Sequence, residues 1–157
     1  MKKLTIVLFI FLFISCAGQK KEPEKIVDFS GVWARENNDV VSKIFINQQG
    51  KEVKFTWTQE AKDGSWKIEC NDAGECDKVQ NGEKVEHYSF SVGISEDGRK
   101  LSVNWLARNL KTGSIVPFTD EIEMSSGGKE IISKPIAFDK SGKKVYPGEE
   151  YRFHKSE

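Results

Sequence analysis

The sequence predicts an all-β fold: an antiparallel meander of about eight strands closed into a barrel, after an N-terminal signal peptide and a flexible tether. Two observations predict the strands. From Phe29 onward, apolar residues recur at every second position, which is the period of a strand with one buried face. Turn-forming pairs that contain glycine separate these runs at short intervals. A third observation, an apolar leader that ends at a cysteine, predicts export.

The leader covers residues 1–15. Lys2 and Lys3 give it a positive start, and residues 4–14 are apolar except for Thr5, a run suited to a signal peptide and too short to span a bilayer. Its end, Ile-Ser before Cys16, resembles the lipobox of bacterial lipoproteins. The resemblance implies a diacylglycerol on the Cys16 sulfur and a further acyl chain such as palmitate on its amino group. An ordinary secretory signal that happens to contain a cysteine is the alternative.

Residues 16–28 are polar and charged and include Pro23, so we expect a lipidated cysteine followed by a flexible tether. The remaining residues, 29–157, have the length of one domain with a single modest core. The whole chain carries 24 basic and 24 acidic residues. Because the two signs are interspersed and no basic stripe forms, a nucleic-acid partner is not expected.

The domain alternates between strand runs and turns. Glu-Val-Lys-Phe-Thr-Trp-Thr is the clearest run, and the pairs between runs include Asn-Gly and Asp-Gly, the strongest local hairpin signals. A flat sheet of this size would leave two edges and a bare apolar face. Closure into a barrel removes both, and a sandwich removes most of them. The predicted strands cover residues 31–33, 52–58, 66–70, 88–92, 101–105, 118–124, 131–133 and 151–153.

With Cys16 assigned to lipid, Cys70 and Cys76 remain as an even pair in an oxidising compartment. The five residues between them are rich in turn formers, so the chain can bring the two sulfurs together. A disulfide that fixes one hairpin end is therefore predicted. The alternative, a metal or redox site, lacks further ligands and the Cys-x-x-Cys spacing.

A Gly-x-Trp sequence opens the domain at Gly31 and Trp33. It resembles the first strand of lipocalin-like (calycin) barrels. The resemblance implies that Gly31 lets the strand bend, that Trp33 closes the barrel floor, and that Arg152 in the last strand covers the indole through a cation–π contact. Alternation places Tyr151 and Phe153 inward, so Arg152 reaches Trp33 only at a rim or beside a bulge.

The inward positions are rich in aromatic residues, which leaves two interpretations open. The side chains either fill the barrel completely or line a mouth that holds an apolar ligand, with Trp57, Tyr88, Trp105 and Phe118 as the ligand-binding set. The full inward set comprises Val53, Phe55, Trp57, Trp66, Ile68, Tyr88, Phe90, Leu101, Val103, Trp105, Phe118, Ile122 and Met124.

Asp120 shares the inward face with Phe118 and Ile122. A carboxylate that points into an apolar barrel must be paired, protonated or solvated, so Asp120 is a candidate polar anchor for a ligand. A bulge or a wet strand end would instead turn it outward. The chain shows no catalytic triad order, phosphate loop or metal-ligand cluster, and we expect neither an enzyme nor a cofactor or metal.

These patterns favour a membrane-anchored lipoprotein of the bacterial cell envelope, at the outer membrane or the periplasmic face, that binds a small apolar or amphipathic ligand in its barrel. The alternative is a filled barrel that acts as a protein-interaction or inhibitor module for an envelope partner. That alternative predicts an exposed apolar patch, for which residues 110–117 and the hairpin between Cys70 and Cys76 are the candidate places.

Overall fold

The computed structural model describes residues 25–71, 73–138, 141, 143–145 and 149–156, and every secondary-structure element within them is a strand. No helix in this described part is long and apolar enough to cross a membrane. The predicted signal peptide and Cys16 lie outside the described residues. The strands are β1 (Gly31–Glu36), β2 (Val40–Gln49), β3 (Glu52–Ala61), β4 (Trp66–Cys70), β5 (Glu75–Gln80), β6 (Glu83–Ile94), β7 (Lys100–Asn109), β8 (Ile115–Met124), β9 (Glu130–Phe138), β10 (Lys144–Val145) and β11 (Tyr151–Lys155).

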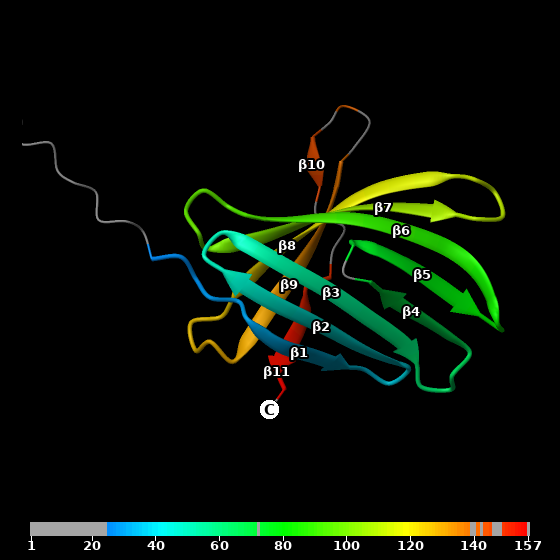
Figure 1. Cartoon of the computed structure of the whole chain (residues 1–157), viewed down its shortest axis with the longest axis horizontal. Coiled ribbons are helices and arrows are strands. Elements are labelled where there is room, and N and C mark those ends of the chain that lie inside the picture. Colours follow the sequence, from blue (N-terminus) through cyan, green and yellow to red (C-terminus); the bar gives the residue numbers. More distant parts are fainter. Residues whose placement is uncertain (1–24, 72, 139–140, 142, 146–148, 157) are drawn as a thin grey trace, which may run out of the picture.

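The strands form a closed antiparallel barrel (Figure 1). Each strand from β1 to β9 pairs with the next one in the chain, β11 bridges β9 and β1, and β10 is a short addition to β9. The ring therefore contains ten of the described strands. Closure satisfies the backbone groups of the ladder without leaving two long sheet edges. The prediction of a closed antiparallel barrel is confirmed, with more strands than the expected eight.

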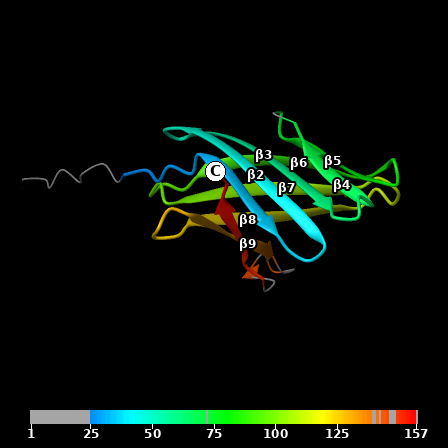
Figure 2. The same ribbon diagram turned by 90° about the horizontal axis from the view of Figure 1, so that it is seen from below.

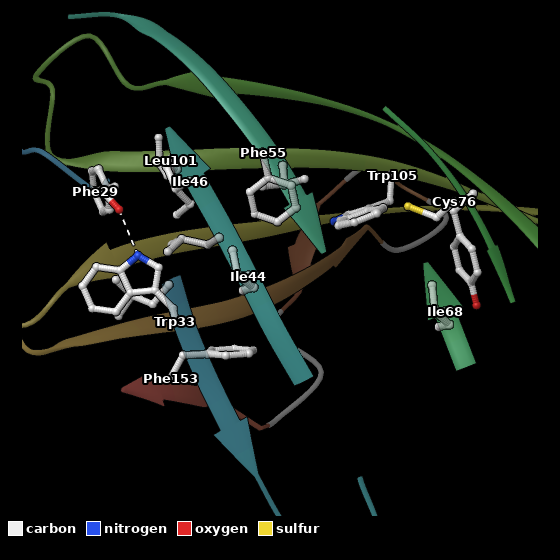
Figure 3. Close-up of a cluster of buried hydrophobic side chains, with 14 residues drawn as sticks. Phe29, Trp33, Ile44, Ile46, Phe55, Ile68, Cys76, Leu101, Trp105 and Phe153 are labelled. Atoms are coloured by element: carbon white, nitrogen blue, oxygen red, sulfur yellow. Dashed lines mark hydrogen bonds between the residues drawn. The ribbon is translucent and has the colours of Figure 1, made fainter. Parts of the chain in front are cut away.

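One end of the barrel, called here the base, is closed by Trp33 and Phe29, both of which are completely buried. The Trp33 indole nitrogen donates a hydrogen bond of 2.9 Å to the Phe29 carbonyl, so the two residues lock together (Figure 3). Gln48 reinforces this end, because its side chain accepts from the Phe29 amide and donates to the Val27 carbonyl. Val27 also packs against the core, so the last residues of the predicted tether already contact the barrel.

Lys155, and not Arg152, covers Trp33. The Lys155 ammonium lies 5.3 Å from the centroid of the indole ring. Arg152 lies on the outer face of β11, where its guanidinium is 3.2 Å from the Glu130 carboxylate and 3.6 Å from that of Glu150. The expected role of Arg152 is therefore corrected, and the reason is strand alternation. Phe153 and Lys155 share the inner face, whereas Arg152 between them faces outward.

The β4–β5 hairpin lies between β3 and β6 over only part of their length (Figures 1 and 2). It pairs with β3 at residues 58–60, whereas closer to the base Phe55 of β3 meets Phe90 of β6 ring to ring, with centroids 5.5 Å apart. The barrel thus has eight strands near the base and ten at the opposite end, called here the mouth. Because barrel diameter grows with strand number, the inserted hairpin widens the mouth.

The predicted disulfide joins Cys70 and Cys76 at the inner tip of this hairpin, where the two residues face each other across the β4–β5 ladder. Gly74, in the turn between them, accepts a hydrogen bond of 2.8 Å from the Phe90 amide. A Cβ atom at Gly74 would lie 2.8 Å from the Phe90 carbonyl oxygen, so only glycine permits this approach. The cross-link therefore holds together the tip that contacts β6.

The turn predictions agree with the structure. Six of the predicted glycines sit at strand connections with positive φ, which is the backbone region that favours glycine. They are Gly50, Gly64, Gly82, Gly98, Gly113 and Gly128; a further glycine in a turn-forming pair of the sequence, Gly142, lies outside the described residues. Each predicted inward residue belongs to the buried core or packs against it.

Replacing Gly31 with alanine should destabilise the protein. Gly31 has a φ of +144°, and a Cβ atom there would lie 2.8 Å from Lys155 Cε. Backbone strain of this kind costs about 1–3 kcal/mol. The matched control is Gly93→Ala in β6, where a Cβ atom meets nothing within 4 Å and the φ is not positive. This control should change the free energy of unfolding by less than about 1 kcal/mol. Urea unfolding followed by tryptophan fluorescence measures both, and equal losses would contradict the role given to Gly31.

Candidate functional site

A cavity of about 480 Å³ lies inside the mouth half of the barrel. Ten of its lining side chains are aliphatic or aromatic and six are polar or charged, and residues exposed to solvent, Asn37 and Glu149, stand at its rim. A concave, mainly apolar space with a few polar groups is the usual form of a small-molecule site. The interior is therefore not filled. The aromatic lining consists of Phe55, Trp57, Trp105, Phe118, Tyr151 and Phe153.

Trp105 of β7 is the centre of the aromatic wall. Its ring stacks nearly parallel to Phe118, with centroids 5.8 Å apart, and meets Trp57 edge-on at 5.3 Å. Phe55 and Phe90 contact the same indole from the base side, at 6.0 and 4.9 Å. Offset and edge-to-face pairs of this kind stabilise one another beyond the area they bury. The contacts fix the orientation of Trp105, and with it the direction of its N–H group.

That N–H group points at Asp120. The Trp105 indole nitrogen donates a hydrogen bond of 3.0 Å to Asp120 Oδ2. Ser133 of β9, which is buried, also hydrogen-bonds the Asp120 side chain. Desolvation by the surrounding wall raises the pKa of Asp120 above its ordinary value of 3.8, and the two hydrogen bonds oppose that rise. The inward interpretation of Asp120 is confirmed, since the residue lines the cavity.

Further polar groups lie toward the mouth. The Arg35 guanidinium lies over the Tyr151 ring, 4.3 Å from its centroid. The Gln59 amide donates to the Ser42 hydroxyl at 3.0 Å, which satisfies a buried serine at an inward position of β2. The cavity thus combines an apolar body, one deep carboxyl group and a rim with hydrogen-bonding side chains.

Four of the five predicted ligand-binding residues, Trp57, Trp105, Phe118 and Asp120, lie together in this lining. Tyr88 lies outside it: the tyrosine is buried, packs edge-on against Trp57, and donates its hydroxyl proton to Glu86. Burial and the Glu86 carboxylate both raise the pKa of Tyr88.

Sequence reasoning missed Arg35 and Ser133 as lining residues, and it placed Tyr151 inward without including it in the ligand-binding set. The available signal was strand alternation: Arg35 has the same parity as Trp33, and Ser133 the same parity as Ile131. Both are polar residues at inward positions, Ser133 beside Asp120 and Arg35 over Tyr151 toward the mouth. Alternation extended to the ends of these strands predicts both of them as inward.

The comparisons with known proteins give no relative: no family model, curated protein or solved structure matches the chain. Among the described residues, no three histidine, cysteine or acidic side chains gather in a metal-binding arrangement. The geometry of the cavity is therefore the basis for the functional argument.

The two carboxyl groups of β8 with opposite pKa shifts should give opposite pH dependences of stability. Because burial raises the pKa of Asp120 in the folded state, its proton stabilises the fold at acid pH, and this stabilisation is lost as the pH rises through the raised pKa. As the pH rises from acid to neutral, the free energy of unfolding of the unaltered chain should therefore fall relative to that of Asp120→Asn. The measurement is the free energy of unfolding in urea at both pH values.

Glu123→Gln is the matched control. Hydrogen bonds from Lys100 and Lys134 lower the pKa of Glu123, so its contribution is present above the unfolded-state pKa and lost at acid pH. This variant should lose stability at neutral pH and match the unaltered chain at acid pH. For each variant, the quantity to compare is its stability difference from the unaltered chain at acid and at neutral pH. If this difference changed with pH in the same direction for both variants, the opposite pKa shifts of Asp120 and Glu123 would be contradicted.

Proposed function

We propose that this protein is an exported, lipid-anchored member of the lipocalin-like barrels that binds a small apolar or amphipathic molecule in the mouth cavity. The observation that carries the proposal is the cavity of about 480 Å³, which is lined by aromatic rings and holds one hydrogen-bonded carboxyl group. Burial of an apolar body against these rings supplies affinity, and the polar groups orient the ligand.

The shape of the barrel supports this proposal. The base is closed by completely buried Trp33 and Phe29, so a ligand enters from the mouth. The β4–β5 hairpin adds two strands at that end only, and barrel diameter grows with strand number. A barrel of about eight strands is just wide enough to be filled by its own side chains or to hold one small ligand.

Native mass spectrometry of the exported mature protein tests the proposal. We expect an added mass that leaves on denaturation, whereas lipid on Cys16 would be covalent and would stay. Phe118→Ala removes one wall of the cavity. Since a buried aromatic ring contributes more than about 1.4 kcal/mol, this variant should bind the ligand about tenfold more weakly and carry less of the added mass.

The control for that variant is Phe45→Ala, the same change at a ring on the outer face of β2 that is 38% exposed. Its occupancy should match that of the unaltered chain. An apo mass for the unaltered chain, unchanged after incubation with a panel of lipids and hydrophobic metabolites, would contradict the binding function.

The anchor has its own test at Cys16. Cys16→Ser should abolish the covalent lipid mass and release the protein from the membrane fraction, because two or more acyl chains are what make anchoring stable. Ser15→Ala keeps a small residue before the cysteine and should remain lipidated. Secretion of a mature chain with an unmodified Cys16 would show instead an ordinary signal peptide.

A second candidate function, docking of an envelope protein, is favoured by the end of the β7–β8 hairpin. Leu106, Leu110, Ile115 and Val116 are 50, 45, 52 and 58% exposed. Residues 115–118 of β8 pair with β7 on one side, and the described pairing with β9 begins only at Thr119. Apolar side chains beside an open strand edge are suited to strand addition by a partner. A mature protein that carries no added mass, and binds none of the lipids and hydrophobic metabolites, would favour this function.

A further inference from the structure

In the described part of the chain, Asp120 has no cationic partner. Among the described residues, no lysine, arginine or histidine forms an ion pair with it, and its hydrogen bonds come from the neutral donors Trp105 and Ser133. An ionised carboxyl group offers about four acceptor positions. The two donors leave acceptor capacity on a group that lines the cavity. A buried charge of this kind is costly unless the group is protonated or a ligand compensates the charge.

The charges of the lining favour a cation over an anion. Two carboxyl side chains, Asp120 and Glu149, and one guanidinium, that of Arg35, line the cavity. Arg35 stands over Tyr151, and both lie at the mouth ends of their strands. The deep part of the cavity therefore contains a carboxyl group without a basic side chain beside it.

The aromatic wall adds to this preference. The faces of tryptophan and phenylalanine rings carry negative electrostatic potential and attract ammonium groups, most strongly where water is excluded. Trp105 and Phe118 stack as a parallel pair next to Asp120, and Trp57 stands edge-on to the indole of Trp105. A carboxyl group in an aromatic-lined space is complementary to an organic cation and repels an anion.

We propose that the ligand of this cavity carries a protonated amine, which pairs with Asp120 while the apolar part of the ligand lies against Trp57, Trp105 and Phe118. This inference rests on the proposed ligand-binding function and specifies its ligand class. The amine donates to the free acceptor positions of Asp120, and the charge-assisted hydrogen bond is stronger than that of a neutral donor. An alcohol supplies a donor without the charge, and a carboxylate ligand supplies neither.

Three probes with one common body test the inference: phenylbutylamine, phenylbutanol and phenylbutyrate. The mature protein is placed in phosphatidylcholine nanodiscs at neutral pH, and binding is measured by calorimetry with empty nanodiscs as the blank. We expect the amine to bind about tenfold or more tightly than either other probe, as for a hydrogen bond between charged groups.

Asp120→Asn keeps the shape of the side chain and removes its charge. This variant should weaken amine binding about tenfold and change alcohol binding less than threefold, in keeping with the loss of one charge-assisted contact. The matched control, Glu123→Gln, makes the same change at a carboxylate that pairs with Lys100 and Lys134. It should leave the affinities of all three probes as in the unaltered chain.

The comparison of probes on the unaltered chain is decisive even where a variant fails to fold. Alcohol or carboxylate binding as tight as amine binding would overturn the cationic ligand and leave the binding function standing. If a folded Asp120→Asn variant bound the amine as tightly as the unaltered chain does, the cationic ligand would likewise be overturned and the binding function would stand. No binding of any of the three probes would overturn the cavity function together with this inference.

Discussion

Strand β11 joins the two ends of the meander, because it pairs with β9 on one side and with β1 on the other, and the interior depends on this closure. Four residue pairs with β9 and two with β1 complete the ring. Once the sheet is closed, alternate residues of every strand must share one enclosed space. The large inward side chains then meet from opposite walls, as Phe55 and Trp105 do, and the packing of that space decides where a cavity can remain.

The two ends of the enclosed space differ for a physical reason. At the base, Phe29 and Trp33 cover the opening, and their mutual hydrogen bond satisfies the one polar atom that the indole brings into the core. At the mouth, the β4–β5 hairpin increases the circumference of the barrel, and the cavity lies in this half, lined mainly by side chains of the other strands. The disulfide between Cys70 and Cys76 closes the tip of that hairpin, and Gly74 in this tip accepts a hydrogen bond from the Phe90 amide of β6.

The same wall that leaves room for a ligand controls the chemistry of Asp120. Contacts with four other rings hold the Trp105 indole, whose N–H group donates to the carboxyl oxygen. Desolvation raises the pKa of the acid, while the hydrogen bonds from Trp105 and Ser133 favour its charged form. A ligand cation would shift that balance, which links occupancy of the cavity to the protonation of a single group.

Much of the fold was predictable from residue order. Period-2 alternation and glycine turns gave the strand class, the inward set and six hairpin connections in the described residues. Two barrel strands were missed. In β2, Ser42 is buried and Phe45 exposed, which hides the alternation, and in β5 only Cys76 is buried. The family resemblance implies that Arg152 covers Trp33, whereas strand parity turns Arg152 outward and places Lys155 at the indole.

The sequence by itself determined which residues face inward, where the chain turns and which cysteines pair, because these properties depend on neighbours within a few positions. Tertiary structure decided that the barrel has ten strands, that one end is closed while the other holds a cavity, and that Trp105 and Ser133 meet Asp120. These features depend on how distant strands meet around a closed ring. The volume left inside such a ring is set by all of its side chains together, and no local pattern records it.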